Sequence, residues 1–285
     1  MVVLTVAGAL DMATARLKGA GIPSPRQEGR LLLADALSVS PEKLVLEPGL
    51  SLQEAEYARF EAALEKREKR MPMAQVLGRR EFWSRSFKVT ADTLDPRPDS
   101  ETLISSVLSA FPDQDAPLRL LDLGTGTGCL LLTLLSEYPQ ASGLGIDLSD
   151  AACRVAVENA TSLGLASRVI FAVGDWGRGL DGTYDVIVSN PPYIPEAEIE
   201  TLAAEVADFE PRLALSGGAD GLACYRDLMP DITRLLAPGG GAFLEIGQGQ
   251  AGDVSALAET EGMALVSEIP DLSGIVRCLA LVRDI

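Results

Sequence analysis

Short apolar runs alternate with longer amphipathic stretches from residue 117 to the end of the chain. Strand–helix alternation of this kind is typical of a seven-stranded, doubly wound α/β sheet that is mostly parallel. The last two runs are separated only by the short loop 270–276, so we expect a hairpin that places one antiparallel strand in the sheet. The predicted strands are 119–123, 143–147, 169–173, 185–189, 241–246, 264–269 and 277–282, with helices at 127–137, 149–162, 219–236 and 248–260.

The N-terminal part of the chain shows helical periodicity without any strand–helix alternation. Ser51-Leu52-Gln53-Glu54 has the spacing of a capping box and predicts the start of a helix. Aromatic residues set among polar ones predict a hairpin over 75–90, and Asp99 is expected to cap the helix that follows. We therefore expect a small all-helical, substrate-docking domain at 1–73, a β-hairpin linker at 74–98 and an α/β domain at 99–285.

The chain contains no histidine. This absence excludes Ser-His-Asp triads, Cys-His dyads and histidine acid–base catalysis. Its four cysteines are scattered and form no Cys-x-x-Cys pair, so we predict neither a metal site nor a disulfide framework. No apolar stretch approaches the length of a membrane span, and the N-terminus lacks the basic flank of a signal peptide. We expect a cytoplasmic protein with no membrane association.

The charge of the chain is divided unevenly. Residues 1–90 carry a net charge of +3, whereas residues 91–285 carry −20. A domain of that sign repels a phosphate backbone, because nucleic-acid binding rests largely on cationic contacts. Nucleic acid is therefore a poor candidate for the direct substrate, although a local patch can differ from the total.

A glycine-rich turn, Gly124-Thr125-Gly126-Thr127-Gly128, follows a predicted strand and opens a helix. Its glycines permit a tight turn and close approach of the backbone to a ligand. Asp147 ends the next strand, 21 residues after Gly126, where a carboxylate can accept both hydroxyls of a ribose. A dinucleotide fingerprint needs glycine at position 129, which is Cys129 here. The pattern therefore suits S-adenosyl-L-methionine better than NAD.

Two further cofactor candidates, Asp175 and Trp176, follow the third predicted strand. An aspartate can accept a hydrogen bond from an exocyclic amine, and a tryptophan can pack on an aromatic base. Because the carboxyl ends of parallel strands border the ligand crevice of a doubly wound sheet, we expect this pair to contact adenine.

The fourth predicted strand stops abruptly at Asn190-Pro191-Pro192-Tyr193. Two consecutive prolines fix two φ angles and remove two backbone donors. Asn190 offers one acceptor and two donors, and Tyr193 adds a flat aromatic face. We predict that this group binds a planar amide or amine as substrate, with Asn190, Pro191 and Tyr193 as catalytic residues and Asn190 also bordering the cofactor.

Over nearly its whole length the chain resembles the release-factor glutamine methyltransferase family, the bacterial protein-(glutamine-N5) methyltransferases. Asn-Pro-Pro-Tyr alone is shared with adenine-N6 and cytosine-N4 DNA methyltransferases, so the flanking segments make the resemblance specific. Two residues depart from the family pattern: Asp95 replaces an apolar residue, and Ser216 lies where Asp is frequent. The segments that carry the resemblance are 78–83, 96–101, 122–128, 190–193, 209–215, 217–218, 220–221 and 245–247.

The resemblance implies that the methyl acceptor is the glutamine of the Gly-Gly-Gln loop of class I peptide chain release factors. In this reading, the side-chain oxygen of Asn190 and the carbonyl of Pro191 each accept one N–H of that glutamine amide, and Tyr193 packs on it. We take a monomer as the working expectation. The alternatives are a DNA adenine-N6 methyltransferase, which would flip its base into the same pocket, and a non-catalytic binding module.

Overall fold

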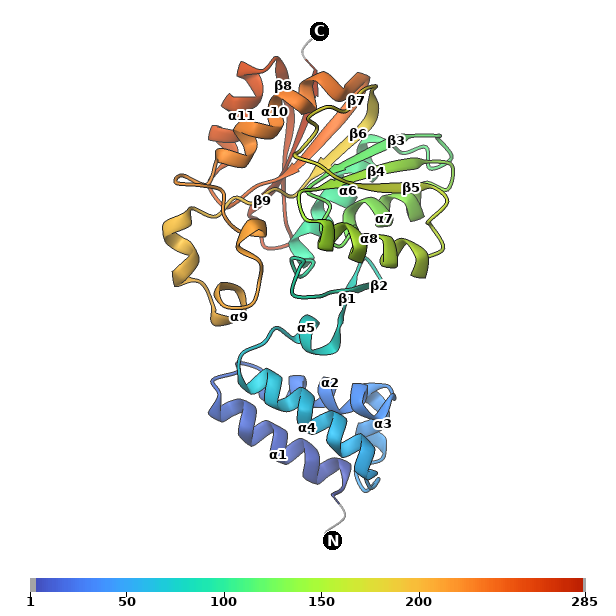
Figure 1. The fold of residues 1–285 in the computed structure, drawn as a ribbon, viewed down its shortest axis with the longest axis vertical. Helices are drawn as coiled ribbons and strands as arrows, with labels where there is room; N and C mark the ends of the chain where they lie inside the picture. Colours follow the sequence, from blue (N-terminus) through green and yellow to red (C-terminus); the bar gives the residue numbers. More distant parts are fainter. Residues whose placement is uncertain (1–3, 284–285) are drawn as a thin grey trace. The chain divides into compact units, whose positions relative to one another are not determined.

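The computed structural model describes residues 4–283 (Figure 1). They form two compact units. The helical unit comprises the residues up to Gly78 together with Ala203–Phe209, and the sheet unit comprises Arg79–Leu202 and the residues from Glu210 onward. The outer limits of the predicted domains, at 1–3 and 284–285, lie outside the described residues.

The helical unit has its own apolar core, which includes Leu17, Leu33 and Phe60. The capping box predicted at Ser51–Glu54 is wrong, because Ser51 instead forms an isolated bridge with Thr5. The helix starts later, and Glu56 accepts a hydrogen bond from the Gln53 backbone N–H at 2.8 Å. The helices of this unit are α1 (Val6–Gly19), α2 (Pro25–Leu37), α3 (Pro41–Leu46), α4 (Glu54–Glu68), α5 (Met73–Leu77) and α9 (Ala204–Ala207).

Ala203–Phe209, which we call the docked segment, is far from the rest of the helical unit in sequence. Its Glu205 carboxylate accepts hydrogen bonds from Arg67 at 3.1 Å and from Arg70 at 2.7 Å. The Arg67 side chain is buried and also pairs with Glu28 at 2.5 Å. Gln75 donates to the backbone oxygen of Phe209 at 3.1 Å. Hydrogen bonds from Arg67, Arg70 and Gln75 thus hold the docked segment against the rest of the helical unit.

The predicted hairpin is present as β1 (Arg79–Phe82) and β2 (Arg85–Lys88), which pair antiparallel. It belongs to the sheet unit, because the Trp83 indole donates to Glu137 at 3.0 Å and Asn159 accepts from the Lys88 backbone at 2.6 Å. The predicted linker 74–98 is therefore divided, with 74–78 in the helical unit and 79–98 in the sheet unit.

The seven-stranded sheet has the order β5-β4-β3-β6-β7-β9-β8. Strands β3 to β7 pair in parallel, and β9 is antiparallel to both of its neighbours. This confirms the predicted doubly wound fold and its terminal hairpin. The strands are β3 (Arg119–Leu123), β4 (Ser142–Asp147), β5 (Val169–Val173), β6 (Tyr184–Ser189), β7 (Leu236–Glu245), β8 (Met263–Pro270) and β9 (Val276–Arg283).

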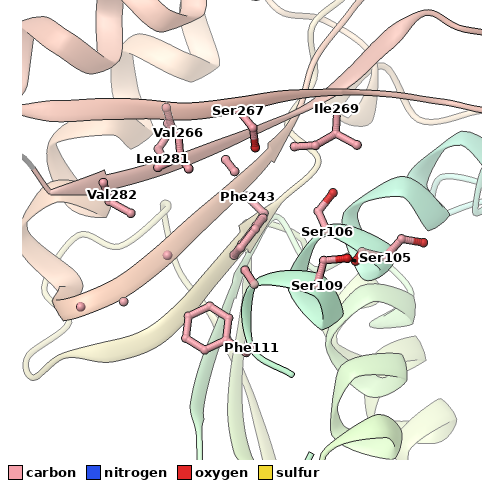
Figure 2. Close-up of a pocket in the computed structure, with 15 residues that line it drawn as sticks. Ser105, Ser106, Ser109, Phe111, Phe243, Val266, Ser267, Ile269, Leu281 and Val282 are labelled. Carbon is pink, nitrogen blue, oxygen red and sulfur yellow. Dashed lines mark hydrogen bonds between the residues drawn. The ribbon is translucent and has the colours of Figure 1, made fainter. Parts of the chain in front are cut away.

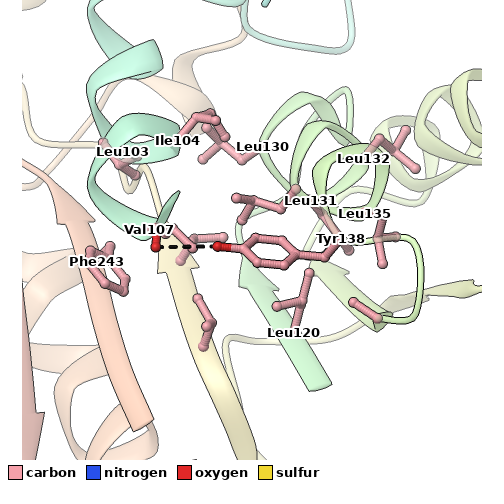
Figure 3. Close-up of a cluster of buried hydrophobic side chains, with 14 of the residues drawn as sticks. Leu103, Ile104, Val107, Leu120, Leu130, Leu131, Leu132, Leu135, Tyr138 and Phe243 are labelled. Atoms are coloured by element: carbon pink, nitrogen blue, oxygen red, sulfur yellow. Dashed lines mark hydrogen bonds between the residues drawn. The ribbon is translucent and has the colours of Figure 1, made fainter. Parts of the chain in front are cut away.

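Helices cover both faces of this sheet. One buried apolar cluster joins the sheet to α6, α7 and α8, and a second joins it to α10 and α11. Figure 3 shows the first cluster, in which the Tyr138 hydroxyl donates to the carbonyl of Val107. The helical segments of the sheet unit are η1 (Pro98–Ser100), α6 (Glu101–Ala110), α7 (Cys129–Glu137), α8 (Asp150–Ser162), η2 (Glu196–Thr201), η3 (Arg212–Ala214), α10 (Ala223–Leu235) and α11 (Ala251–Thr260).

The start of α6 differs from the sequence prediction. Asp99 does not cap this helix, because η1 precedes it and the Asp99 carboxylate faces Arg277 at 3.5 Å. Within residues 4–283, no helix is both long enough and apolar enough to cross a membrane.

Candidate cofactor and substrate site

A cavity of about 570 Å³ lies at the carboxyl ends of β3, β4, β5 and β6. Its volume falls in the range of roughly 300–1,000 Å³ that is usual for small-molecule and cofactor sites. Gly128, Pro191 and Tyr193 do not line it. The predicted site residues that do line it are Gly124, Thr125, Gly126, Thr127, Asp147, Asp175, Trp176, Asn190 and Pro192.

The glycine-rich turn depends on backbone conformations that only glycine adopts easily. Gly124, Gly126 and Gly128 all have positive φ, at 77°, 55° and 78°. A Cβ on Gly128 would lie 3.1–3.3 Å from three packed side chains, whereas a Cβ on Gly126 would meet nothing within 4 Å. Gly128 is therefore required for packing, and Gly126 leaves open space where a ligand can approach the backbone.

Beneath the glycine-rich turn lies the buried carboxyl of Asp122, to which the Thr125 hydroxyl donates at 2.7 Å. Burial raises the pKa of Asp122 to about 7, and the nearby charge of Asp147 also raises it, whereas the Thr125 hydrogen bond lowers it. Asp122 thus fixes the turn from inside the protein rather than contacting a ligand.

Asp147 connects the glycine-rich turn to the end of β4. Its Oδ2 accepts from the Gly126 backbone N–H at 2.8 Å, and its Oδ1 accepts from the Ser149 backbone N–H at 2.9 Å. Each carboxylate oxygen can accept more than one hydrogen bond. Both oxygens therefore hold the side chain in place and can still accept from a pair of vicinal hydroxyls in the cavity.

Asp175 and Trp176 lie where β5 ends, as predicted. Asp175 forms an ion pair with Arg178, and its side chain is 45 % exposed. Trp176 has a positive φ of 52°, which is unusual for a residue other than glycine. A Cβ on Gly124 would lie 3.4 Å from the Trp176 ring, so this ring packs along the glycine-rich turn.

The Asn190 side chain has a defined partner at the end of β6. Its Nδ2 donates to the Ser100 hydroxyl at 3.2 Å. The part of the chain that the structure describes forms no hydrogen bond to the Asn190 Oδ1. The amide therefore presents an acceptor at the cavity that a ligand N–H can use.

Tyr193 and Pro191 lie behind the cavity. The Tyr193 hydroxyl donates to Glu245 Oε1 at 3.3 Å, and Gln250 donates to the Tyr193 carbonyl at 3.1 Å. Burial raises the pKa of Tyr193, with the charge of Glu245 as a further cause. Pro191 is also buried. The structure thus does not bring the Tyr193 ring onto the cavity lining.

Sequence reasoning did not single out Arg97, Ser100, Glu210 or Glu245 as individual site residues. Arg97 donates to both carboxylate oxygens of Glu210, at 2.7 and 2.8 Å. Burial raises the pKa of Glu210 to about 7, although the charge of Arg97 lowers it. This pair joins two loops that line the cavity. All four residues fall inside segments that carry the family resemblance, which was the available signal.

Asp95, the first departure from the family pattern, is buried within loop 91–97, whose other residues line the cavity. Its Oδ1 lies 3.6 Å from the Arg80 guanidinium. Burial raises the pKa of Asp95, whereas the charges of Arg80 and Arg97 lower it. Among residues 4–283, no group of three His, Cys, Asp or Glu side chains is placed to hold a metal ion. The four cysteines are free thiols.

A second cavity, of about 490 Å³, lies between α6 and strands β7, β8 and β9 (Figure 2). Ser105, Ser106 and Ser109 face it, but each hydroxyl donates to a carbonyl of its own helix. The remaining lining is mostly apolar and contains none of the predicted site residues.

Comparison with known proteins matches both parts of the chain. Residues 8–78 match the family described as the PrmC N-terminal domain, and residues 114–246 match a methyltransferase domain. A protein of Rhodospirillum rubrum named release factor glutamine methyltransferase is 48 % identical over 95 % of this chain and 82 % of its own length. One of the same name from Cereibacter sphaeroides is 46 % identical over 95 % and 96 %.

A solved structure shares the fold of the sheet unit. The crystal structure of a ribosomal protein L11 methylase from Lactobacillus delbrueckii subsp. bulgaricus aligns with a TM-score of 0.51 at 19 % identity. The alignment covers 68 % of this chain and 83 % of the other.

Proposed function

The chain belongs to the family of release factor glutamine methyltransferases, and on that premise we propose what it transfers and to which atom. It transfers a methyl group from S-adenosyl-L-methionine to the side-chain amide nitrogen (N5) of the Gly-Gly-Gln glutamine in class I peptide chain release factors. The observation that carries this proposal is the Asn190 Oδ1, an unused amide acceptor that borders the same cavity as the glycine-rich turn.

The residues that line the cavity fit S-adenosyl-L-methionine. The open space at Gly126 admits a close-lying ligand, the Asp147 oxygens suit the ribose hydroxyls, and the Trp176 ring with Asp175 suits adenine. When bound, the cofactor supplies a methyl group that is activated by a positively charged sulfur. We therefore assign the cofactor to residues 124–128, Asp147, Asp175, Trp176 and the edge formed by Asn190.

Asn190 acts on the acceptor by aligning it. A carboxamide nitrogen is a poor nucleophile because its lone pair is delocalised into the carbonyl. When the Asn190 Oδ1 accepts one N–H, the lone pair is held in the direction of the methyl group. This is catalysis by orientation and preorganised dipoles. The Pro191 carbonyl, expected to accept the other N–H, belongs to a buried residue that does not line the cavity. The surplus proton of the methylated amide leaves to water, so no histidine is needed.

Pro192 and Tyr193 complete the proposed substrate site in different ways. Pro192 borders the cavity directly. Tyr193, bonded to Glu245 through its hydroxyl and to Gln250 through its carbonyl, holds the loop from behind. We further propose that the helical unit docks the release factor, and that the protein acts as a monomer in the cytoplasm.

The alternative, a DNA adenine-N6 methyltransferase, is disfavoured. Residues 91–285 carry a net charge of −20, which repels the DNA backbone. The relatives at 46–48 % identity are named for release factors.

The proposal is tested by incubating the purified chain with isotope-labelled methyl donor and, in parallel, a class I release factor or duplex DNA. A release factor in which the Gly-Gly-Gln glutamine is replaced by glutamate is the matched control, because it lacks the amide nitrogen. We expect label in the wild-type factor alone. Label in DNA without label in the release factor would overturn the assignment.

A further inference from the structure

Two hydrogen-bonded pairs of polar side chains lie behind the cavity, one at Asn190 and one at the last residue of β7, Glu245. Asn190 Nδ2 donates to Ser100 Oγ at 3.2 Å, and the Tyr193 hydroxyl donates to Glu245 Oε1 at 3.3 Å. Glu245 is 1 % exposed and does not line the cavity. Its Oε2 is buried and lacks a hydrogen-bond donor among the described residues. A buried carboxylate oxygen without a donor is destabilising, so a nearby donor is expected to serve it.

Ser100 is placed to be that donor. A hydroxyl has one proton to give and two lone pairs with which to accept. Because Asn190 Nδ2 is itself the donor to Ser100, the proton of Ser100 is not used in that bond. Among the described residues no hydrogen bond joins Ser100 to Glu245 Oε2, but the Ser100 hydroxyl lies near enough to lower the pKa of Glu245.

We propose that Glu245 is a positioning residue, whose ionised carboxylate accepts from Ser100 and Tyr193 and thereby keeps the Asn190 Oδ1 turned toward the acceptor amide. In this arrangement the Ser100 hydroxyl donates its one proton in a hydrogen bond to Glu245, so Ser100 can only accept from Asn190. The Asn190 amide must then present Nδ2 inward and Oδ1 to the cavity. A flipped Asn190 amide would need the Ser100 proton and would leave Glu245 unpaired. The inference rests on the proposed function for its effect on catalysis.

The charges around Glu245 place its ionisation near neutral pH. Burial raises the pKa of Glu245 to about 7. Ser100, Arg277 on β9 and Tyr193 lower it, and Asp99 raises it. Arg277 only partly compensates the charge, because it also faces Asp99 at 3.5 Å and Asp271 at 3.2 Å.

The other titratable neighbours remain neutral in this range. Burial is the largest cause of the raised pKa of Tyr225, Cys129 and Cys278, and the charge of Glu245 raises each one further. When Glu245 is protonated, its carboxyl becomes a hydrogen-bond donor and no longer requires the Ser100 proton. Ser100 then no longer fixes the orientation of the Asn190 amide. We therefore expect the ordered state of Asn190 to be lost below a pH of about 7.

The first test follows the Asn190 side chain itself and needs no methyl acceptor. In ¹⁵N-labelled full-length protein, the Asn190 NH₂ signals are identified by their absence in Asn190→Asp. In the wild type we expect these signals to titrate with a midpoint near pH 7, and in Glu245→Gln to show no such titration. Asp231→Asn, a buried carboxylate that bonds to Gly177 and Arg234 instead, is the matched control and should titrate like the wild type. We call the proposed hydrogen bonds from Glu245 through Ser100 to Asn190 the relay. Identical titration in Glu245→Gln and the wild type would overturn the relay.

The second test measures catalysis. Loss of one orienting hydrogen bond should lower kcat about tenfold in Glu245→Gln and in Ser100→Ala, with donor affinity retained as evidence of folding. Ser100→Thr keeps the hydroxyl and should restore kcat. The wild-type kcat should rise with pH through about 7, and this rise should be missing in Glu245→Gln.

Two outcomes separate the relay from the proposed function. Wild-type kcat and pH profile in both Glu245→Gln and Ser100→Ala would refute the relay while leaving the methyltransferase assignment intact. If the wild type methylated no release factor, the proposed function would fail, and the Asn190 titration would still decide whether the relay exists.

Discussion

The loops that follow β3 and β6 border one cavity but are held in opposite ways. Loop 124–128 is fixed by its backbone, through three glycines with positive φ and an N–H donated to Asp147. The loop after β6 contains two prolines, which offer no backbone N–H. It is held instead by side-chain hydrogen bonds, from Asn190 to Ser100 and from Tyr193 to Glu245. We infer that donor binding depends on the backbone of loop 124–128 and on the Asp147 carboxylate that holds it, whereas methyl transfer is sensitive to a buried polar network.

The largest effect is expected at the loop after β6. Asn190→Ala removes the proposed acceptor and should lower kcat by about 100- to 1,000-fold, or about 2.7–4 kcal/mol of transition-state stabilisation. Donor affinity should fall much less than kcat, because Asn190 forms only the edge of the cofactor site and loop 124–128 is unchanged. Single-turnover kinetics with saturating donor measure the first quantity, and calorimetry measures the second. Near-normal transfer would show that Asn190 does not align the acceptor.

The converse effect is expected at the glycine-rich turn. Asp147→Asn removes a charged acceptor and should weaken donor binding by about 1.5–3 kcal/mol, with kcat at saturating donor largely retained. Asp175→Asn is the matched control, since Asp175 is half exposed and paired with Arg178, and its loss of affinity should be smaller. A loss of kcat without a loss of donor affinity in Asp147→Asn would reverse the comparison.

Each loop also rests on a buried carboxyl whose pKa is about 7: Asp122 beneath loop 124–128 and Glu245 behind Asn190. The unfolded chain releases these protons near pH 4, so the folded chain holds protons that the unfolded chain has lost. The free energy of unfolding should therefore fall as pH rises from about 4.5 through about 7, and then level off. Each group contributes at most about 1.4 kcal/mol per pH unit.

Denaturant titrations across this pH range measure the slope. Glu210, whose pKa is also about 7, contributes to it as well, and the chain has no histidine that would add to it. Asp122→Asn and Glu245→Gln should each flatten the slope. If neither variant does so, the carboxyls that support the two loops do not titrate as the structure indicates.

The smallest effect is expected at a surface that belongs to neither loop. Leu46, at the end of α3, is 80 % exposed. If the helical unit docks the release factor, Leu46→Ser should raise KM for that substrate by roughly fivefold, about 1 kcal/mol of apolar contact. kcat and donor affinity should not change. Leu272→Ser, on an exposed loop of the sheet unit, is the control, and an equal effect there would count against a docking role for α3.

The fold could be predicted because strand–helix alternation, glycine-rich turns and prolines that end a strand are determined by residues that are neighbours in sequence. The predictions failed where distant residues decided the local structure. Ser51 bridges to Thr5 rather than capping a helix, and Asp99 faces Arg277 rather than capping α6. The docked segment, Ala203–Phe209, belongs to the helical unit because Glu205 accepts hydrogen bonds from Arg67 and Arg70. No local sequence pattern predicts these contacts.

The candidate site shows the same division. Candidate site residues that lie at a strand end, such as Asp147 and Asn190, could be named from the sequence. Ser100 and Glu245 could not, because their proposed role comes from contacts with Asn190 and Tyr193 that are distant in sequence. Tyr193 was predicted to cover the substrate, yet its hydroxyl is bonded to Glu245 and its ring lies off the cavity lining.

The most direct test of the account is the position of the methyl group on a class I release factor after incubation with this protein and S-adenosyl-L-methionine. Fragmentation mass spectrometry of the product locates it. We predict one added methyl group, on the side-chain nitrogen of the Gly-Gly-Gln glutamine, in the product of the wild-type protein and almost none with Asn190→Ala. A methyl group on any other residue, or an unmodified glutamine after complete incubation, would contradict the account.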